Sequence, residues 1–326
     1  MEENKNEQVS GIKQLQEAAE SIKKVIADTA ENTMPDPVRY FFEKNGITEY
    51  QLEAVNERKG RYCYSYEKAG ARFFLKWNRE GESYQLYHDA LTLEHTVYRT
   101  LQGQGLTPVY IEREDAPELL ITEYMETEGT LREVLKNLEE AGDTERIYRL
   151  VSALFRKWCN YVKLLSAESE AMNLSGTGEE LYTKYLNSLY LSGPFDTKGK
   201  RVEMYRNRVV NKLTKKLDAG KVREMIGSLD YEVLPVVHGD FHANNILVAG
   251  DEPVILDLES TRTGIPEIEL AYMYAQIAVL IRSRKELIRK LNTFINREVT
   301  VLRDRHVFWE FFRTYYTAAR RNHRFY

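Results

Sequence analysis

The segment that most constrains this chain is VVHGDFHANNILVAGDEPVILDLE, residues 236–259. A polar stretch leads into the apolar run Ile246–Val248, and a second apolar run follows at Val254–Leu256. The residues between them, Ala249–Pro253, have the glycine, aspartate and proline that are typical of a tight turn. The segment therefore predicts a loop followed by a two-stranded hairpin.

Three polar side chains flank this predicted hairpin. Asp240 and Asn245 precede its first strand, and Asp257 follows its second strand. Because a hairpin returns the chain to its starting end, we expect the three to lie close together. Carboxylate and amide oxygens suit Mg²⁺, which shares its ligand shell with phosphate groups and water. Such a cluster can position and neutralise a phosphoryl group during transfer.

The runs HGDFHANNIL and ILDLE resemble the HGDxHxxNxL and IDxE motifs of the aminoglycoside phosphotransferase and choline kinase-like superfamily. The resemblance implies a two-lobed protein-kinase-like fold of the α+β class. It implies that Asp240 is the catalytic aspartate and that His238 supports the catalytic loop. Asn245 and Asp257 become the Mg²⁺ ligands. A zinc site at His238 and His242 is disfavoured, since no cysteine lies near and no helical spacing aligns them.

Length and composition fit a two-lobed protein. The chain has 326 residues, of which 43% are apolar, and no run of eighteen apolar residues occurs. Only two cysteines, Cys63 and Cys159, are present, which excludes a disulfide framework and is compatible with the cytoplasm. The net charge of −4 predicts no bulk attraction to nucleic acid. We therefore expect a cytoplasmic protein with no membrane-spanning segment.

Two helices are predicted before the first strand, and together they form an N-terminal extension over residues 1–46. Gly11–Ala30 has apolar residues in steps of three and four, which is typical of a heptad seam. With only two heptads, we interpret it as a helix that packs on its own domain, with a short helix for homodimerisation or docking as the alternative. In the second helix Asp36 is the expected N-cap, and Gly46 is expected to end the helix.

Residues 47–125 are predicted to form a kinase-like N-lobe that begins with a three-stranded meander over residues 47–77. By the resemblance, Lys76 on the third strand binds nucleotide phosphate, although an outward-facing lysine is the alternative. Glu94 lies on the apolar face of a helix predicted at Gln85–Gln102. It resembles the helix glutamate that orients this lysine.

The strand before residue 126 resembles the hinge between kinase lobes. The carbonyl of Glu123 and the amide of Met125 would then face the adenine of ATP, with GTP as the alternative nucleotide. The turn between the first two strands has a single glycine, Gly60, where protein kinases have a glycine-rich loop. This indicates reduced nucleotide contact rather than its absence.

Residues 126–326 are predicted to form a helical C-lobe with a substrate-side insertion. Its helices include Arg146–Leu165, Arg201–Leu217 and the C-terminal residues from Ala271 onward. The segment TRTGIPEIELAYM resembles the Gly-Asp-Pro-x-x-Asp-Leu-Ala segment of the superfamily, with Glu269 in place of aspartate. The sequence alone therefore does not define the role of this acid.

The segment Asp196–Glu224 in the expected insertion carries ten lysines or arginines and four acids. We interpret it as a site for an anionic hydroxyl acceptor, such as a phosphorylated sugar or an envelope glycan near a membrane surface, with a solvated helix face as the alternative. The predicted function is transfer of the γ-phosphoryl group of ATP to a small molecule or glycan. An atypical protein kinase and a nucleotide-binding pseudokinase are the alternatives.

Overall fold

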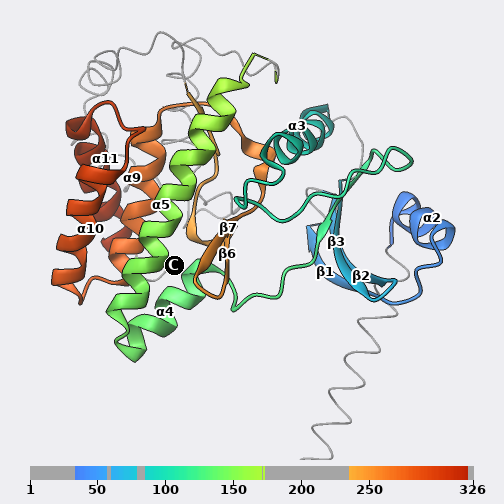
Figure 1. The fold of residues 1–326 in the computed structure, drawn as a ribbon, viewed down its shortest axis with the longest axis horizontal. Coiled ribbons are helices and arrows are strands. Elements are labelled where there is room, and N and C mark those ends of the chain that lie inside the picture. Colours follow the sequence, from blue (N-terminus) through green and yellow to red (C-terminus); the bar gives the residue numbers. More distant parts are fainter. Residues whose placement is uncertain (1–33, 57–59, 79–84, 171, 173–234, 322–326) are drawn as a thin grey trace, which may run out of the picture. The chain divides into compact units, whose positions relative to one another are not determined.

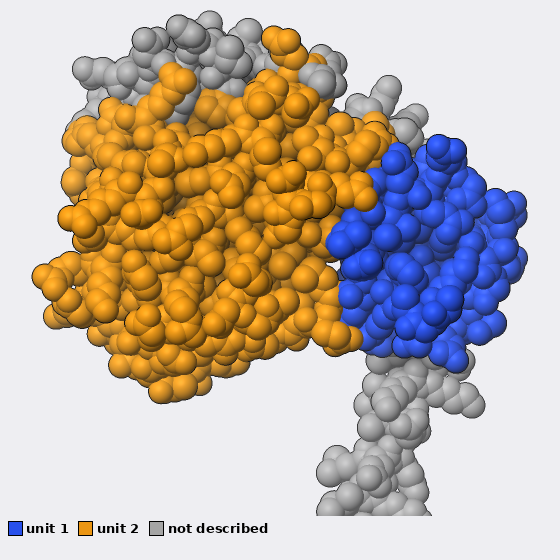
Figure 2. Space-filling view, viewed as in Figure 1, with its two compact units in different colours: residues 1–91, 109–124 blue, residues 92–108, 125–326 orange. Residues whose placement is uncertain are grey.

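The computed structural model describes residues 34–321 except 57–59, 79–84, 171 and 173–234. The chain divides into two compact units, one of residues 1–91 and 109–124 and the other of residues 92–108 and 125–326 (Figure 2). Three predicted segments lie outside the described residues: the helices Gly11–Ala30 and Arg201–Leu217, and the basic segment Asp196–Glu224.

The first unit is built on an antiparallel sheet in the order β1-β2-β3-β4 (Figure 1). Its strands are rich in aromatic and apolar residues, and the predicted meander is confirmed. The β2–β3 turn has two residues, Ala69 and Gly70, both at positive φ, as the twist of a two-residue hairpin requires. The strands are β1 Tyr50–Asn56, β2 Arg61–Lys68, β3 Ala71–Asn78 and β4 Leu119–Glu123.

Helix α2, Asp36–Lys44, contributes to the core of this sheet. Phe42 stacks on Tyr50 with ring centroids 5.0 Å apart and meets Tyr64 edge-on. The predicted cap at Asp36 is wrong. Pro35 adopts the extended backbone of the N-cap and the side chain of Asp36 makes no capping bond, so the helix begins one residue earlier than expected. Gly46 follows the helix at a φ of 62°, as predicted.

The second unit is mainly helical, as predicted. Helix α9 lies at its centre, buried along almost its whole length and packed against α4 and α11, while α5 packs against α4 and α10. The border between the units falls inside α3, between Leu91 and Thr92. The helices are α3 Gln85–Leu101, α4 Leu131–Ala141, α5 Thr144–Ala167, α9 Pro266–Leu280, α10 Lys285–Glu298 and α11 Arg305–Arg321.

Short strands and single helical turns connect α5 to α9. The predicted hairpin is present, but its turn is shorter than predicted: Gly250 and Asp251 suffice, and Pro253 already pairs with Val248. No helix in the described ranges is long and apolar enough to cross a membrane. The elements are β5 Val236–Val237, η1 Ala243–Asn245, β6 Ile246–Ala249, β7 Glu252–Ile255, η2 Leu258–Ser260 and β8 Arg262–Thr263.

Candidate active site

The hairpin brings Asp240, Asn245 and Asp257 together within the second unit. Its last pair is Ile246 with Ile255, and the amide of Leu256 then donates to the carbonyl of Asn245 at 2.9 Å. The side-chain Nδ2 of Asn245 donates to the Asp240 carbonyl at 3.0 Å and to Asp240 Oδ2 at 3.4 Å. The three residues thus share one end of the hairpin, as their positions in the sequence indicate.

Asp240 has a half-exposed carboxylate that is held ionised. The partial burial of Asp240 acts to raise its pKa, and the negative charge of Asp257 acts in the same direction. His242, whose Nε2 lies 3.5 Å from Asp240 Oδ2, lowers the pKa and prevails, so that it lies below its ordinary value. An exposed carboxylate that stays ionised can accept a proton from a hydroxyl group.

Asp257 has a left-handed backbone, with φ 58° and ψ 60°. Among the described residues only Ala69, in a hairpin turn, shares a positive φ without being a glycine. A side chain in this region costs free energy and persists where its surroundings fix it, most often at functional sites. The chain therefore holds this carboxylate in a strained conformation at the end of the hairpin.

His238 is fully buried and connects the loop before the hairpin to the segment after it. Its Nε2 donates to the carbonyl of Leu256 at 2.7 Å, and its Nδ1 accepts from the amide of Asp240 at 3.3 Å. This pattern fits the neutral imidazole with its proton on Nε2. His238 is thereby a positioning residue, which orients the backbone of Asp240 and of the residue before Asp257.

Glu269, on α9, fixes the same loop from the other side. Its Oε1 accepts from the amide of Gly239 at 2.6 Å, and its Oε2 accepts from the amide of His238 at 3.2 Å. Oε2 also accepts from the indole Nε1 of Trp158, on α5, at 2.8 Å. This carboxylate is 6% exposed and satisfies three donors. It gives the acid of the IPEIEL segment a structural role that its spacing alone left open.

Gly239 is required by its surroundings. Its φ is 83°, and a Cβ atom there would lie 2.0 Å from the carbonyl oxygen of Ser260. The carbonyl of Gly239 in turn accepts from Nη2 of Arg262 at 3.0 Å. The loop therefore passes directly over the η2 turn, where only glycine fits.

The segment after Asp257 is held by three buried hydrogen bonds. The amide of Leu258 donates to Oε1 of Glu94, on α3, at 3.2 Å. Thr261 donates its hydroxyl to the carbonyl of Leu258 at 2.7 Å and accepts from the Tyr161 hydroxyl at 2.7 Å, because its single proton is already used. Burial raises the pKa of Tyr161 well above its usual range, which keeps that hydroxyl protonated.

A magnesium ion at this site would be held by Asn245 and Asp257. In the part of the chain that the structure describes, no three histidine, cysteine or acidic side chains form a metal cluster. One carboxylate and one amide still fit Mg²⁺, which takes few protein ligands and completes its shell with phosphate oxygens and water. The side chain of Asn245 fits this role. Its nitrogen donates to Asp240, so its oxygen is the atom that remains to bind the metal ion.

The remaining predicted site residues belong to the two units separately. Lys76 lies on β3 opposite Leu120 and is 4% exposed, so the outward-facing alternative is wrong. Glu123 is the last residue of β4 in the same unit. Its amide donates a hydrogen bond to the carbonyl of Val109, which also belongs to that unit. Met125 begins the next part of the second unit.

The residues of the site that were not predicted from the sequence include Trp158, Thr261 and Arg262. Trp158 looks like any apolar residue of an amphipathic helix, and it lies 111 residues from its partner Glu269. The other two lie in the TRTGIPEIELAYM segment, in which the acid is the residue that the motif marks. Thr261 and Arg262 donate their hydrogen bonds to backbone carbonyls. Because every residue has such a carbonyl, the sequence carries only a weak signal for these two contacts.

A comparison with protein families identifies the family of this chain. Residues 61–298, which is most of the chain, match the model of the phosphotransferase enzyme family, APH. Comparison with curated proteins gave no match.

Solved structures share the fold at low sequence identity. The GDP and kanamycin complex of the phosphotransferase APH(2")-IIIa is 15% identical with a TM-score of 0.50, over 85% of this chain and 94% of that one. A choline kinase from Cryptosporidium parvum is 12% identical with a TM-score of 0.50, over 91% and 86%. A choline kinase from Streptococcus pneumoniae is 11% identical with a TM-score of 0.47, over 93% and 92%.

Proposed function

Because this chain belongs to the phosphotransferase enzyme family, a group of kinases that phosphorylate hydroxyl groups, we propose that it transfers the γ-phosphoryl group of ATP to a hydroxyl of a small molecule or glycan. One observation carries the proposal: Asp240, Asn245 and Asp257 lie together at the same end of the hairpin.

In the proposed reaction Asp240 accepts the proton of the acceptor hydroxyl. Its depressed pKa keeps it ionised, and its exposure leaves it open to a substrate. A bound Mg²⁺ would neutralise charge on the phosphate groups, and Asn245 and Asp257 are the residues that would hold it. His238 and Glu269 act through the loop backbone, since each bonds to it directly.

Nucleotide binding is proposed for Lys76, for the Glu123 carbonyl and for the Met125 amide. A buried ammonium such as that of Lys76 is stabilised by anions, and nucleotide phosphate supplies them. The amides of Glu123 and Tyr124 already donate to Val109 and Arg72. The Met125 amide is the next along the chain, which supports its assignment to the adenine edge.

The fold does not select the acceptor. The two solved structures with a TM-score of 0.50 are described as a kanamycin complex and as a choline kinase, so one fold accommodates chemically distinct acceptors. The anionic acceptor that we predict from segment Asp196–Glu224 concerns residues outside the described part, and it stays a prediction.

The test compares wild type with Asp240→Asn, using ATP and a panel of hydroxyl acceptors. Loss of the proton acceptor should lower kcat by about 10²–10⁴-fold while leaving nucleotide affinity nearly unchanged. Asp257→Asn keeps a side chain that tolerates the left-handed backbone, and it should instead weaken Mg²⁺-dependent nucleotide binding.

Asp251→Asn is the matched control, because it removes a carboxylate at the opposite end of the same hairpin. It should retain turnover. Near wild-type turnover in Asp240→Asn would refute the assignment. Nucleotide binding without transfer to any acceptor would favour the pseudokinase alternative.

A further inference from the structure

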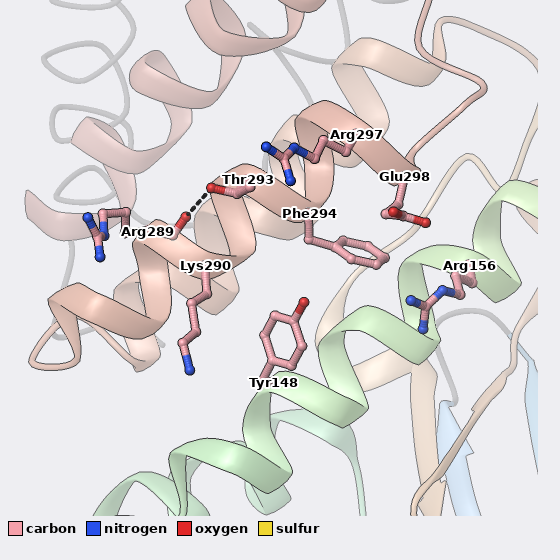
Figure 3. A pocket seen from close by; sticks show the side chains of 8 residues that line it. All are labelled: Tyr148, Arg156, Arg289, Lys290, Thr293, Phe294, Arg297 and Glu298. Atoms are coloured by element: carbon pink, nitrogen blue, oxygen red, sulfur yellow. Dashed lines mark hydrogen bonds between the residues drawn. The ribbon is translucent and has the colours of Figure 1, made fainter.

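A pocket of about 330 Å³ lies between α5 and α10, both in the second unit (Figure 3). Its aromatic part is built from Tyr148 and Phe294, whose rings meet edge-on with centroids 6.4 Å apart. Phe294 is buried, and the guanidinium of Arg156 lies 4.9 Å from its ring centroid. A cation over an aromatic face is stabilised there, so Arg156 is held at the pocket by the ring.

The charged side chains of this pocket are mostly cationic. Arg156, Arg289, Lys290 and Arg297 line it together with a single carboxylate, Glu298. Arg289 is paired with Glu286, outside the pocket, at 2.5 Å. Within the described residues, Arg156, Lys290 and Arg297 have no carboxylate within ion-pair distance. Their shared positive field is what an anionic ligand would neutralise.

This pocket is separate from the candidate active site. Both use α5, but from different faces. With about 100° of rotation per residue, the side that carries Tyr148 and Arg156 is turned about 150° from the side that carries Trp158 and Tyr161. Trp158 bonds to Glu269 and Tyr161 to Thr261, whereas Tyr148 and Arg156 face Phe294 on α10.

We propose that this pocket is a second, non-catalytic binding site for a compact soluble anion with two or more phosphate groups. The forked guanidinium groups of arginine match phosphate oxygens, and the lysine adds a mobile point charge. The size of the hollow is that of a small-ligand site, whereas an anionic membrane or a nucleic acid would need an extended basic surface. The net charge of −4 for the whole chain also opposes bulk attraction to such polyanions.

Inorganic pyrophosphate is the probe, titrated by calorimetry into the full-length protein at low ionic strength. The variant Lys290→Glu with Arg297→Glu should weaken its binding about tenfold or more, since bonds between charged groups are lost. Arg282→Glu with Lys285→Glu is the control, because it makes the same change of charge at exposed positions that do not line the pocket. The control should bind as wild type does.

A single neutral change, Arg156→Gln, tests the α5 side without reversing charge, and it serves if the double variant fails to fold. It should also weaken pyrophosphate binding. Equal affinity in wild type and all three variants, or equal weakening in the pocket and control variants, would overturn the proposal. So would pocket-dependent binding to phosphatidylcholine–phosphatidylserine vesicles without pocket-dependent binding of pyrophosphate.

Discussion

At the scale of single residues, the carboxylate of Glu269 organises the loop that carries Asp240. It accepts three hydrogen bonds, from two backbone amides of that loop and from Trp158. A buried donor that loses its acceptor costs about 1–3 kcal/mol. The fold and the site therefore depend on the same side chain.

Glu269→Gln should lower both stability and turnover. The amide group keeps one acceptor oxygen and turns an NH₂ group toward donors, which leaves at least one of them unsatisfied. We expect the free energy of unfolding to fall by about 1–3 kcal/mol in urea titration. We also expect kcat to fall, because Gly239 directly precedes Asp240.

The control for this variant is Glu267→Gln, two residues earlier on the same helix. Glu267 is fully buried and accepts from the amides of Arg303 and Asp304 at 2.6 and 3.1 Å, not from the loop. It should lose similar stability and keep its kcat in the folded fraction. An equal fall of kcat in both variants would mean that Glu269 acts on activity only through general stability.

The sequence predicted which polar residues meet at the hairpin, because register and turn length are local properties. It could not predict the role of Glu269, since two of its donors are backbone groups that any residue would supply. The third, Trp158, is a distant indole with no distinguishing pattern. Contacts between backbone and remote side chains are therefore the part of the site that a single sequence leaves open.

At the scale of elements, α4 is joined to the hairpin at its N-terminus. The amide of Val248 donates to the carbonyl of Gly129 at 3.0 Å, and Thr130 pairs with Leu247 in an isolated bridge. Thr130 is also the N-cap of α4: it accepts from the amide of Glu133, whose carboxylate accepts from the amide of Thr130 at 2.9 Å. One residue thus begins the helix and borders β6.

Thr130→Ala should destabilise the protein by about 1 kcal/mol, because the first turn of α4 loses its cap. Thr130→Ser keeps the capping oxygen and is the matched control. Thermal or urea unfolding would measure both. If alanine and serine variants prove equally stable, the capping box contributes nothing measurable here.

Elements were predictable where the pattern of residues alone decides them. Segments rich in aromatic and β-branched residues predicted β1 to β3, and the amphipathic run predicted α5. The start of α2 was misjudged because aspartate is a frequent cap, whereas here Pro35 already has the extended conformation that the cap requires. An acid in the first turn is favourable as well, which explains why Asp36 is tolerated inside the helix.

At the scale of the whole molecule, Lys76 and Glu94 belong to different units. The family resemblance of the sequence predicts that the two residues are functionally coupled. The spacing of Glu94 with Val97 and Tyr98 predicted a buried face, and all three are buried. It could not reveal that the Glu94 carboxylate accepts from Leu258, next to Asp257. Periodicity shows that a face is covered, not what covers it.

A double-mutant cycle with Lys76→Ala and Glu94→Gln tests this coupling through kcat/KM for ATP. If the two act as one unit, each single change should cost most of the activity and the double variant little more. Full additivity would place them in independent roles. The amide of Leu258, which donates to Glu94, is a backbone group. It is therefore the same in wild type, both single variants and the double variant, and Leu258 needs no variant of its own.

The left-handed backbone of Asp257 has a consequence for how this protein would respond to selection. Glycine adopts that conformation freely, so Asp257→Gly would relieve strain of about 1 kcal/mol while removing a carboxylate of the proposed magnesium site. A library selected only for resistance to heat should therefore enrich glycine at this position and lose catalysis. Stability and the proposed catalysis therefore favour different residues at position 257.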